Sequence, residues 1–115
     1  MSIVYVVQEP LMRDRVSGEV RPKFDISPAR KYGEVRYLLN WSDDCSDPES
    51  LVKFLTLQLK DYSSVDYILV TGNPNAMAIA TCIAARNTGG LLKLLSWNNL
   101  ERRYIEFPVC LHTPS

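Results

Sequence analysis

The sequence predicts a small Rossmann-like, three-layer α/β domain with a mostly parallel sheet of about five strands, two main helices and a C-terminal antiparallel hairpin. Short apolar runs typical of buried strands alternate with two longer stretches of helical periodicity. This alternation favours parallel strands joined by right-handed crossovers, whereas the last two runs are close enough to form a hairpin. The length of 115 residues fits a single domain over residues 1–115.

The first third of the chain holds two predicted strands and a polar segment between them. The apolar run Ile3–Val7 is the first strand, and Glu34–Leu39 is the second. Residues 11–23 are polar and mixed in charge, and we expect them to form a loop or a β-arm. Before the second strand, Ser27 is expected to cap one helical turn, which Gly33 closes in a left-handed conformation.

The first long helix is predicted to begin after Asp47, its N-cap, and to end near Asp61. Apolar residues recur along it at helical spacing, so one face is expected to cover the sheet. This stripe consists of Leu51, Leu55, Leu59 and Tyr62, widened by Val52 and Phe54.

The second helix is predicted from Pro74 to about Thr88, and Cys82 within it is expected to be a small buried hydrophobe. Alanines four residues apart should let this helix approach its neighbour closely. Pro108 cannot donate to a ladder, so the last strand should lie at an edge. The alanines are Ala76, Ala80 and Ala84, and the strands around the helix are Tyr67–Thr71, Leu91–Trp97 and Arg102–Val109.

Composition excludes several classes of protein. No apolar run is long enough to span a bilayer, and the N-terminus lacks the basic region of a signal peptide, so we expect a cytoplasmic protein without membrane contact. The three cysteines, Cys45, Cys82 and Cys110, have no paired spacing, which disfavours a disulfide framework. A metal site built from them and His112 would need distant segments, so we expect neither a metal nor a cofactor.

Charge is unevenly spread along the chain, although its net value is zero. Residues 13–36 carry seven basic and four acidic side chains, and residues 40–66 carry six acidic side chains and two lysines. A dipolar surface of this kind favours a protein partner. The balanced total differs from the strongly basic charge of a dedicated nucleic-acid binder.

The stretch Gly72-Asn73-Pro74-Asn75 resembles the strand–turn–helix junctions that hold phosphates. Ligands collect at the carboxyl ends of parallel strands, where Gln8, Glu9, Gly72, Asn73 and Asn75 are expected to meet, together with Asn40 and Trp41. Against a phosphate, Pro74 removes one donor, and the Asn73 side chain would itself cap the amide of Asn75 or Ala76. A helix start is therefore the favoured interpretation, and a neutral or nucleotide-like ligand stays as the alternative.

Catalytic groups are not arranged in any recognisable pattern. The single histidine, His112, lies at the C-terminal end, where a Ser/His or Cys/His relay is disfavoured. The adjacent Asp43 and Asp44 are interpreted as a solvated acidic loop. Glu9 follows a strand, but nothing near it in sequence supports acid–base catalysis. We expect a protein that is not an enzyme.

Two stretches combine arginines with other features of binding surfaces. Trp97, Arg102, Arg103 and Tyr104 surround the tip of the predicted hairpin, where aromatic rings beside arginines could stack on single-stranded nucleic acid. Pairing of Trp97 with Tyr104 across the strands is the favoured interpretation, so nucleic-acid binding is disfavoured. The arginines of the polar segment, Arg13, Arg15 and Arg21, alternate with acids and could instead contact a protein.

The blocks VYVVQEP, KFDISPARKYGEVRYLL and DYILVTGNPNAMAIATCIAARNTGGLLKLLSWNNLERRYIEFPV together resemble a group of small proteins encoded by tailed bacteriophages. The resemblance covers most of the chain and implies a phage origin and a place in the host cytoplasm. No activity is established for that group, so no catalytic residue is transferred. By analogy it favours binding to a host or phage protein.

The sequence thus supports two hypotheses. The first is a non-enzymatic protein-interaction module that uses the polar segment and the edge of the last strand, where self-association as a homodimer is also expected. The alternative is a domain that senses or sequesters a nucleotide or small ligand at the strand ends.

Overall fold

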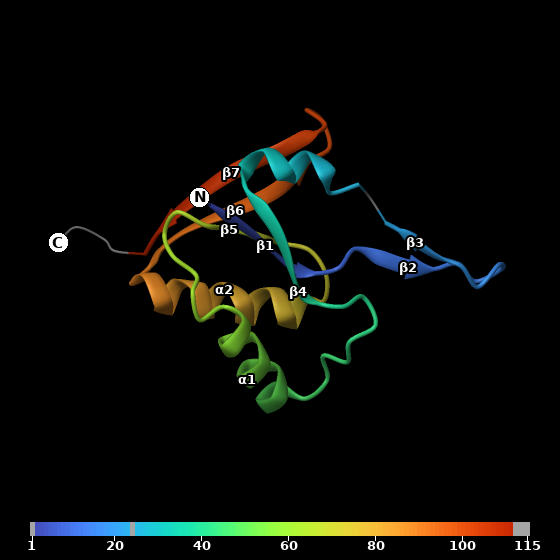
Figure 1. Ribbon diagram of the computed structural model, residues 1–115, viewed down its shortest axis with the longest axis horizontal. Helices are drawn as coiled ribbons and strands as arrows, with labels where there is room; N and C mark the ends of the chain where they lie inside the picture. Colours follow the sequence, from blue (N-terminus) through green and yellow to red (C-terminus); the bar gives the residue numbers. More distant parts are fainter. Residues whose placement is uncertain (1, 24, 112–115) are drawn as a thin grey trace.

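The computed structural model describes residues 2–23 and 25–111 (Figure 1). Most predicted strands and helices are present within a few residues of their expected limits. In chain order the elements are β1 (Ile3–Gln8), β2 (Leu11–Arg13), β3 (Val20–Pro22), the 3-10 helix η1 (Ser27–Tyr32), β4 (Glu34–Leu39), α1 (Pro48–Gln58), β5 (Tyr67–Leu69), α2 (Pro74–Thr88), β6 (Leu91–Asn98) and β7 (Arg103–Cys110).

The main sheet has five strands in the order β4-β1-β5-β6-β7. All neighbours are parallel except β6 and β7, which form the expected antiparallel C-terminal hairpin. The chain moves from β1 outward to β4, then crosses back to β5 and continues to β6. When crossovers of the same handedness run in opposite directions along a sheet, their connecting helices lie on opposite faces of that sheet. The predicted fold class is confirmed, and β7 with Pro108 lies at an edge as expected.

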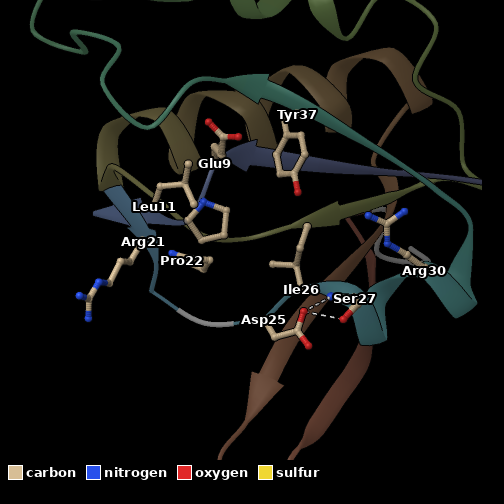
Figure 2. A pocket seen from close by; sticks show the side chains of 10 residues that line it. Glu9, Leu11, Arg21, Pro22, Asp25, Ile26, Ser27, Arg30 and Tyr37 are labelled. Carbon is tan, nitrogen blue, oxygen red and sulfur yellow. Dashed lines mark hydrogen bonds between the residues drawn. The ribbon is translucent and has the colours of Figure 1, made fainter. Parts of the chain in front are cut away.

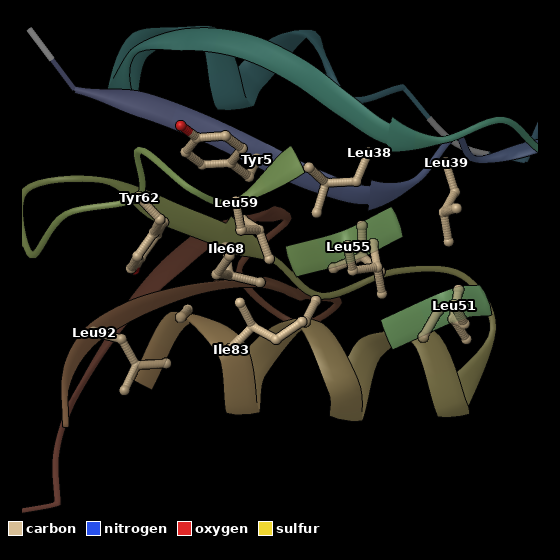
Figure 3. Packing of buried hydrophobic residues seen from close by; sticks show 14 residues of the cluster. Tyr5, Leu38, Leu39, Leu51, Leu55, Leu59, Tyr62, Ile68, Ile83 and Leu92 are labelled. Carbon is tan, nitrogen blue, oxygen red and sulfur yellow. The ribbon is translucent and has the colours of Figure 1, made fainter. Parts of the chain in front are cut away.

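One face of the sheet is covered by α1 and α2, which enclose the larger part of the core (Figure 3). The predicted stripe of α1 buries Leu51, Leu55 and Leu59. The alanines of α2 are also fully buried, as their spacing predicts; they are Ala76, Ala80 and Ala84.

Three residues that were expected to be buried on this side are exposed. Val52 and Phe54 keep 41% and 42% of their surface, and Cys82 is exposed on α2. Val52 and Cys82 border an open groove between α1 and α2, and Phe54 borders a hollow beside Leu39, so solvent reaches all three side chains. The expectation of a buried cysteine and a wider stripe is therefore wrong.

The opposite face carries η1 over a second apolar cluster that includes Val6, Ile26 and Leu69. The predicted capping of this turn is wrong in detail. Ser27 is the first helical residue, and its N–H and hydroxyl both donate to the carboxylate of Asp25. Gly33 is nearly extended, with φ of 157° and ψ of −174°, and a Cβ there would overlap the backbone of Ser2.

Tyr104, which was weighed both as a cross-strand partner of Trp97 and as part of a binding tip, belongs to this second cluster. Its side chain is only 1% exposed, and its ring packs edge-on against Trp97 at 5.1 Å between centroids, which confirms the cross-strand pairing. Among the described residues its hydroxyl has no hydrogen-bond partner, and burial raises its pKa. The hydroxyl therefore adds a desolvation penalty without a compensating bond.

We expect Tyr104→Phe to leave the free energy of unfolding within about 0.5 kcal/mol or to increase it, because it removes an unpartnered buried hydroxyl. Tyr62→Phe is the matched control. The buried Tyr62 hydroxyl donates to the Asp66 carbonyl at 3.2 Å and accepts from the Lys93 N–H at 3.4 Å. Removing the Tyr62 hydroxyl should lower the free energy of unfolding by about 1–2 kcal/mol, measured by urea unfolding. Equal losses of stability in both variants would contradict the conclusion that the Tyr104 hydroxyl is unpartnered.

The polar segment 11–23 forms an antiparallel β-hairpin, which we call the arm. Figure 1 shows the arm projecting from the body beyond the carboxyl end of β1. The radius of gyration is 14.7 Å, against about 13 Å expected for a compact chain of this length. The radius of gyration exceeds that of a compact chain because the arm projects from the body.

Candidate functional site

The carboxyl ends of the parallel strands surround a polar pocket of about 330 Å³, here called the strand-end pocket. It lies where the strand order reverses between β1 and β5, the place at which open α/β sheets bind ligands. Of the predicted ligand residues, Gln8, Glu9, Gly72 and Asn73 line it, whereas Asn75 does not. The other lining residues are Pro10, Leu11, Lys23, Trp41, Asp43, Cys45 and Thr71.

Gln8 holds the strand ends together at the bottom of this pocket. Its side chain is buried, its Oε1 accepts from the N–H of Asn73 at 2.8 Å, and its Nε2 donates to the carbonyl of Asn40 at 3.1 Å. The loops that follow β4 and β5 are thereby tied to the end of β1. Gly72 has φ of 113° and packs against this amide so closely that a Cβ would overlap the Gln8 side chain.

Asn73 caps α2 as the sequence predicts. Its Oδ1 accepts from the N–H of Asn75 at 2.9 Å and of Ala76 at 3.2 Å, and Pro74 occupies the first helical position. With its own N–H bonded to Gln8, the start of α2 has few donors left for an anion. The helix N-terminus is therefore poorly suited to phosphate.

Asn73→Ala is expected to lower the free energy of unfolding by about 1 kcal/mol, because two amides of the first turn lose their acceptor. Asn75→Ala is the matched control. Asn75 is exposed and contributes its backbone N–H to the cap, so its side chain should be worth less than about 0.5 kcal/mol. Thermal unfolding of the two variants measures the difference.

Two charged and reactive side chains in the pocket escaped prediction. Lys23 arrives on the returning strand of the arm, and Cys45 arrives from the loop before α1. Burial raises the pKa of the Cys45 thiol, and the carboxylates of Asp43 and Asp44 raise it further. The thiol therefore stays protonated at neutral pH and is a weak nucleophile.

The described residues hold no group of three or more His, Cys, Asp or Glu side chains that could bind a metal ion. His112, the histidine weighed for a relay or a metal site, lies outside the described residues. Glu9 and Asp43 outnumber Lys23 at the strand-end pocket, so its charge is net negative. This charge opposes a phosphate and tolerates an uncharged polar ligand.

On its other side the root of the arm lines a second pocket, of about 580 Å³ (Figure 2). We call it the arm-root pocket. Tyr37 and Ile26 face each other across it, and Arg30 lies beside Tyr37. Burial raises the pKa of Tyr37, and Glu9 adds to the shift. The remaining lining residues are Glu9, Pro10, Leu11, Arg21, Pro22, Asp25 and Ser27.

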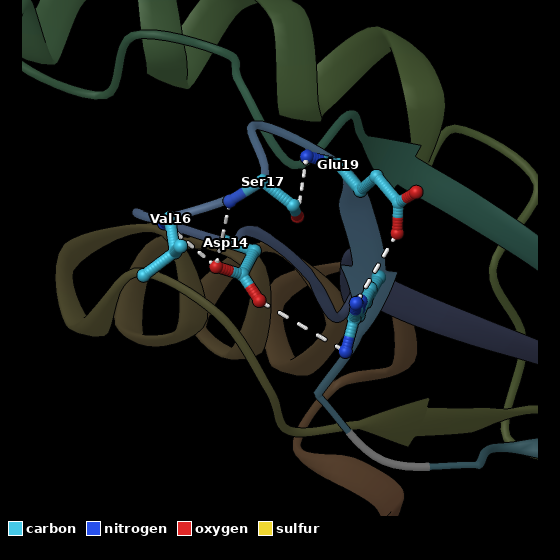
Figure 4. Close-up of polar contacts among 5 residues, drawn as sticks. Asp14, Val16, Ser17 and Glu19 are labelled. Carbon is cyan, nitrogen blue, oxygen red and sulfur yellow. Dashed lines mark hydrogen bonds and ion pairs between the residues drawn. The ribbon is translucent and has the colours of Figure 1, made fainter.

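The apex of the arm is held in shape by a set of local hydrogen bonds (Figure 4). The carboxylate of Asp14 accepts from the N–H of Val16 at 2.8 Å and of Ser17 at 3.2 Å. Arg21 reaches the carboxylate of Glu19 at 3.2 Å and that of Asp14 at 3.9 Å. These bonds order the loop before any partner arrives, which reduces the entropy lost on binding.

The predicted interaction residues of the arm have different surroundings. Arg13 donates to the carbonyl of Gly18 at 3.2 Å, and its guanidinium lies 5.6 Å from the ring centre of Trp41. Arg21 is neutralised by its two carboxylates. Arg15 is exposed, and none of the ion pairs within the described part of the chain includes it.

The tip of the β6–β7 hairpin does not gather its predicted residues into one surface. Tyr104 is buried, and Trp97 packs on its ring. Arg102 takes the left-handed φ of 53°, and Arg103 pairs with Glu101 at 3.3 Å. The predicted group of aromatic and basic side chains is therefore divided between the core and the exposed turn.

Fold and site together define an α/β protein with a mostly parallel sheet, a polar pocket at its strand ends and a projecting hairpin. A family model for phage Pam3 gp32-like protein matches residues 2–111, and the chain belongs to that family. The resemblance to small phage-encoded proteins is thereby confirmed. No curated protein and no solved structure matches the chain. In the described residues, no helix combines the length and apolarity needed to cross a membrane.

Proposed function

We propose that this chain is a non-enzymatic protein-interaction module that acts in the host cytoplasm and binds a protein through the arm. The observation that carries the proposal is the exposure of Val16, which keeps 97% of its surface at the apex of an ordered hairpin. Met12 and Val20 are also exposed on the arm. An apolar anchor on a pre-ordered loop is a typical binding hot spot.

A non-enzymatic role is further supported by the chemistry of the strand-end pocket. The raised pKa of Cys45 leaves a poor nucleophile, and the amide of Gln8 is occupied by backbone partners. These groups stabilise the structure and are badly placed for acid–base or covalent catalysis.

The arm is tested by capturing partners on the immobilised full chain from lysates of infected and uninfected host cells. Val16→Asp should lower the affinity for an arm-bound protein at least ten-fold. Leu100→Asp is the matched control, because Leu100 is 96% exposed at the tip of the other hairpin. A partner that is lost equally from both variants, or from neither, would contradict the proposal.

The strand-end pocket supports a second candidate, a small-ligand site in a Rossmann-like sheet. It is favoured by the position of the pocket at the reversal of strand order. The occupied helix cap and the net negative lining favour a nucleoside or another uncharged polar ligand over a nucleotide. Thermal-shift assays with a panel of nucleosides and nucleotides test this candidate. A ligand at about 100 times its Kd stabilises the folded protein by roughly 2.7 kcal/mol. No shift with any member would exclude it.

A further inference from the structure

The apex of the arm combines an apolar side chain with an unneutralised cation. Val16 is 97% exposed, and Arg15 beside it takes part in none of the ion pairs among the described residues. The complementary surface would be an apolar hollow with carboxylates at its rim.

Such a hollow lies between the end of β4 and the start of α1, with a volume of about 210 Å³. We call it the acidic hollow. Leu39, Leu51 and Phe54 supply its apolar side chains, and Asp43 and Asp44 its charge. Both aspartates are exposed, and no ion pair within the described residues uses either. Ser50 completes the lining.

This hollow has no cation in its lining, unlike the strand-end and arm-root pockets and unlike a hollow of about 280 Å³ beside β6 and β7, which Lys93 lines. The apolar groove between α1 and α2, about 340 Å³ in volume, carries Arg86 at its side and would repel Arg15. Lys23 lines the strand-end pocket, and Arg21 and Arg30 line the arm-root pocket. The acidic hollow has carboxylates and no cation, so it fits the apex of the arm best.

The arm cannot fill the acidic hollow of its own chain. Figure 1 shows the apex standing away from α1 and from the loop before it. The arm nevertheless passes close to that loop, because the guanidinium of Arg13, at the outer end of β2, lies 5.6 Å from the ring centre of Trp41. β2 carries the chain outward as far as Arg13, and the turn that holds Val16 lies beyond it.

We infer that two copies of this chain exchange their arms, each apex occupying the acidic hollow of the other. Arm and hollow lie on the same side of the body, so a two-fold axis between them forms both contacts at once. Arg15 of each copy then faces Asp44 of the other, with Val16 against the apolar lining. This inference rests on the proposed function, since it names a partner for the same arm.

Sedimentation velocity across the micromolar range tests the exchange with charge-reversed chains. Arg15→Glu and Asp44→Arg should each weaken the dimer at least ten-fold, because each reverses both symmetric contacts. In an equimolar mixture, one contact joins Glu to Arg and the other keeps both native partners. A heterodimer should therefore form from two chains that do not dimerise alone, which also shows that both variants are folded.

Leu100→Ser and Phe107→Ser are the controls, at the other hairpin tip and on the exposed edge strand β7. Both should dimerise like the unaltered chain. A monomeric unaltered chain, no recovery in the mixture, or loss of the dimer in Phe107→Ser alone would each overturn the arm exchange. None of these outcomes tests whether the arm binds another protein. That question is answered by the capture experiment that compares Val16→Asp with Leu100→Asp.

Discussion

Replacing Leu55 by alanine is expected to lower the free energy of unfolding by about 3 kcal/mol. Leu55 is fully buried near the middle of α1, in the cluster that joins both helices to the sheet (Figure 3). Truncation removes apolar burial and leaves a cavity that the alanines of α2 are too small to fill. The melting temperature should fall by roughly 10 °C.

Leu57→Ala is the control for this prediction. The two leucines lie in the same helix, but Leu57 keeps 63% of its surface in solvent. Its truncation should change the free energy of unfolding by less than about 0.5 kcal/mol. Calorimetry of both variants separates packing from helix propensity, and similar losses would contradict the assigned face of α1.

Gly72→Ala is expected to cost about 3 kcal/mol as well, for a different reason. The φ of 113° is unfavourable for any residue with a Cβ, and that atom would also overlap the Gln8 Cβ and lie 2.8 Å from its Oε1. Because the Gln8 Cβ is fixed to the backbone, the end of β1 and the turn at Gly72 must move apart, which strains the bonds of the Gln8 amide to Asn73 and Asn40. The substitution therefore loosens three strand ends together.

Gly18→Ala isolates the contribution of backbone strain. Gly18 also has a positive φ, of 75°, but no atom lies within 4 Å of where its Cβ would be. The loss there should be about 1 kcal/mol. Urea unfolding of both variants measures the difference, and a loss at Gly72 no larger than at Gly18 would show that the contact with Gln8 can yield.

The elements set by local signals were predicted closely. The start of α2 follows from Asn73 and Pro74, which act through bonds within one turn, and its end follows from Gly89 in a left-handed conformation. The strand Glu34–Leu39 was predicted with its observed limits, since Gly33 precedes it and the polar Asn40 follows it. Such signals depend on neighbours in sequence, so no knowledge of the tertiary structure is needed.

Exposure on the outer helix faces was not predictable in the same way. Val52, Phe54 and Cys82 are apolar, yet each borders a groove or hollow that is open to solvent. The burial of Tyr104 was not predictable either, because it depends on η1, which covers the face of the sheet on which Tyr104 lies. Which face is covered depends on the packing of distant segments, and periodicity within one element does not report it.

The strand-end pocket was predicted in part. Gln8, Glu9, Gly72 and Asn73 follow from the rule that parallel strands end at one edge of the sheet. Lys23 depends on the pairing of β2 with β3, which a segment of mixed charge leaves undecided between loop and hairpin. The two hydrogen bonds of the Gln8 amide could not be predicted either, because their partners lie 32 and 65 residues away in the sequence.

The separation of the arm from the body has a consequence for how this family can evolve. Neither core cluster of the described residues includes a side chain of the arm, so changes at its apex leave the packing of the sheet untouched. Mutations between residues 12 and 21 can therefore accumulate without unfolding the chain. With the proposed function, the binding specificity of the arm can change under selection while the sheet and helices that carry it stay constant.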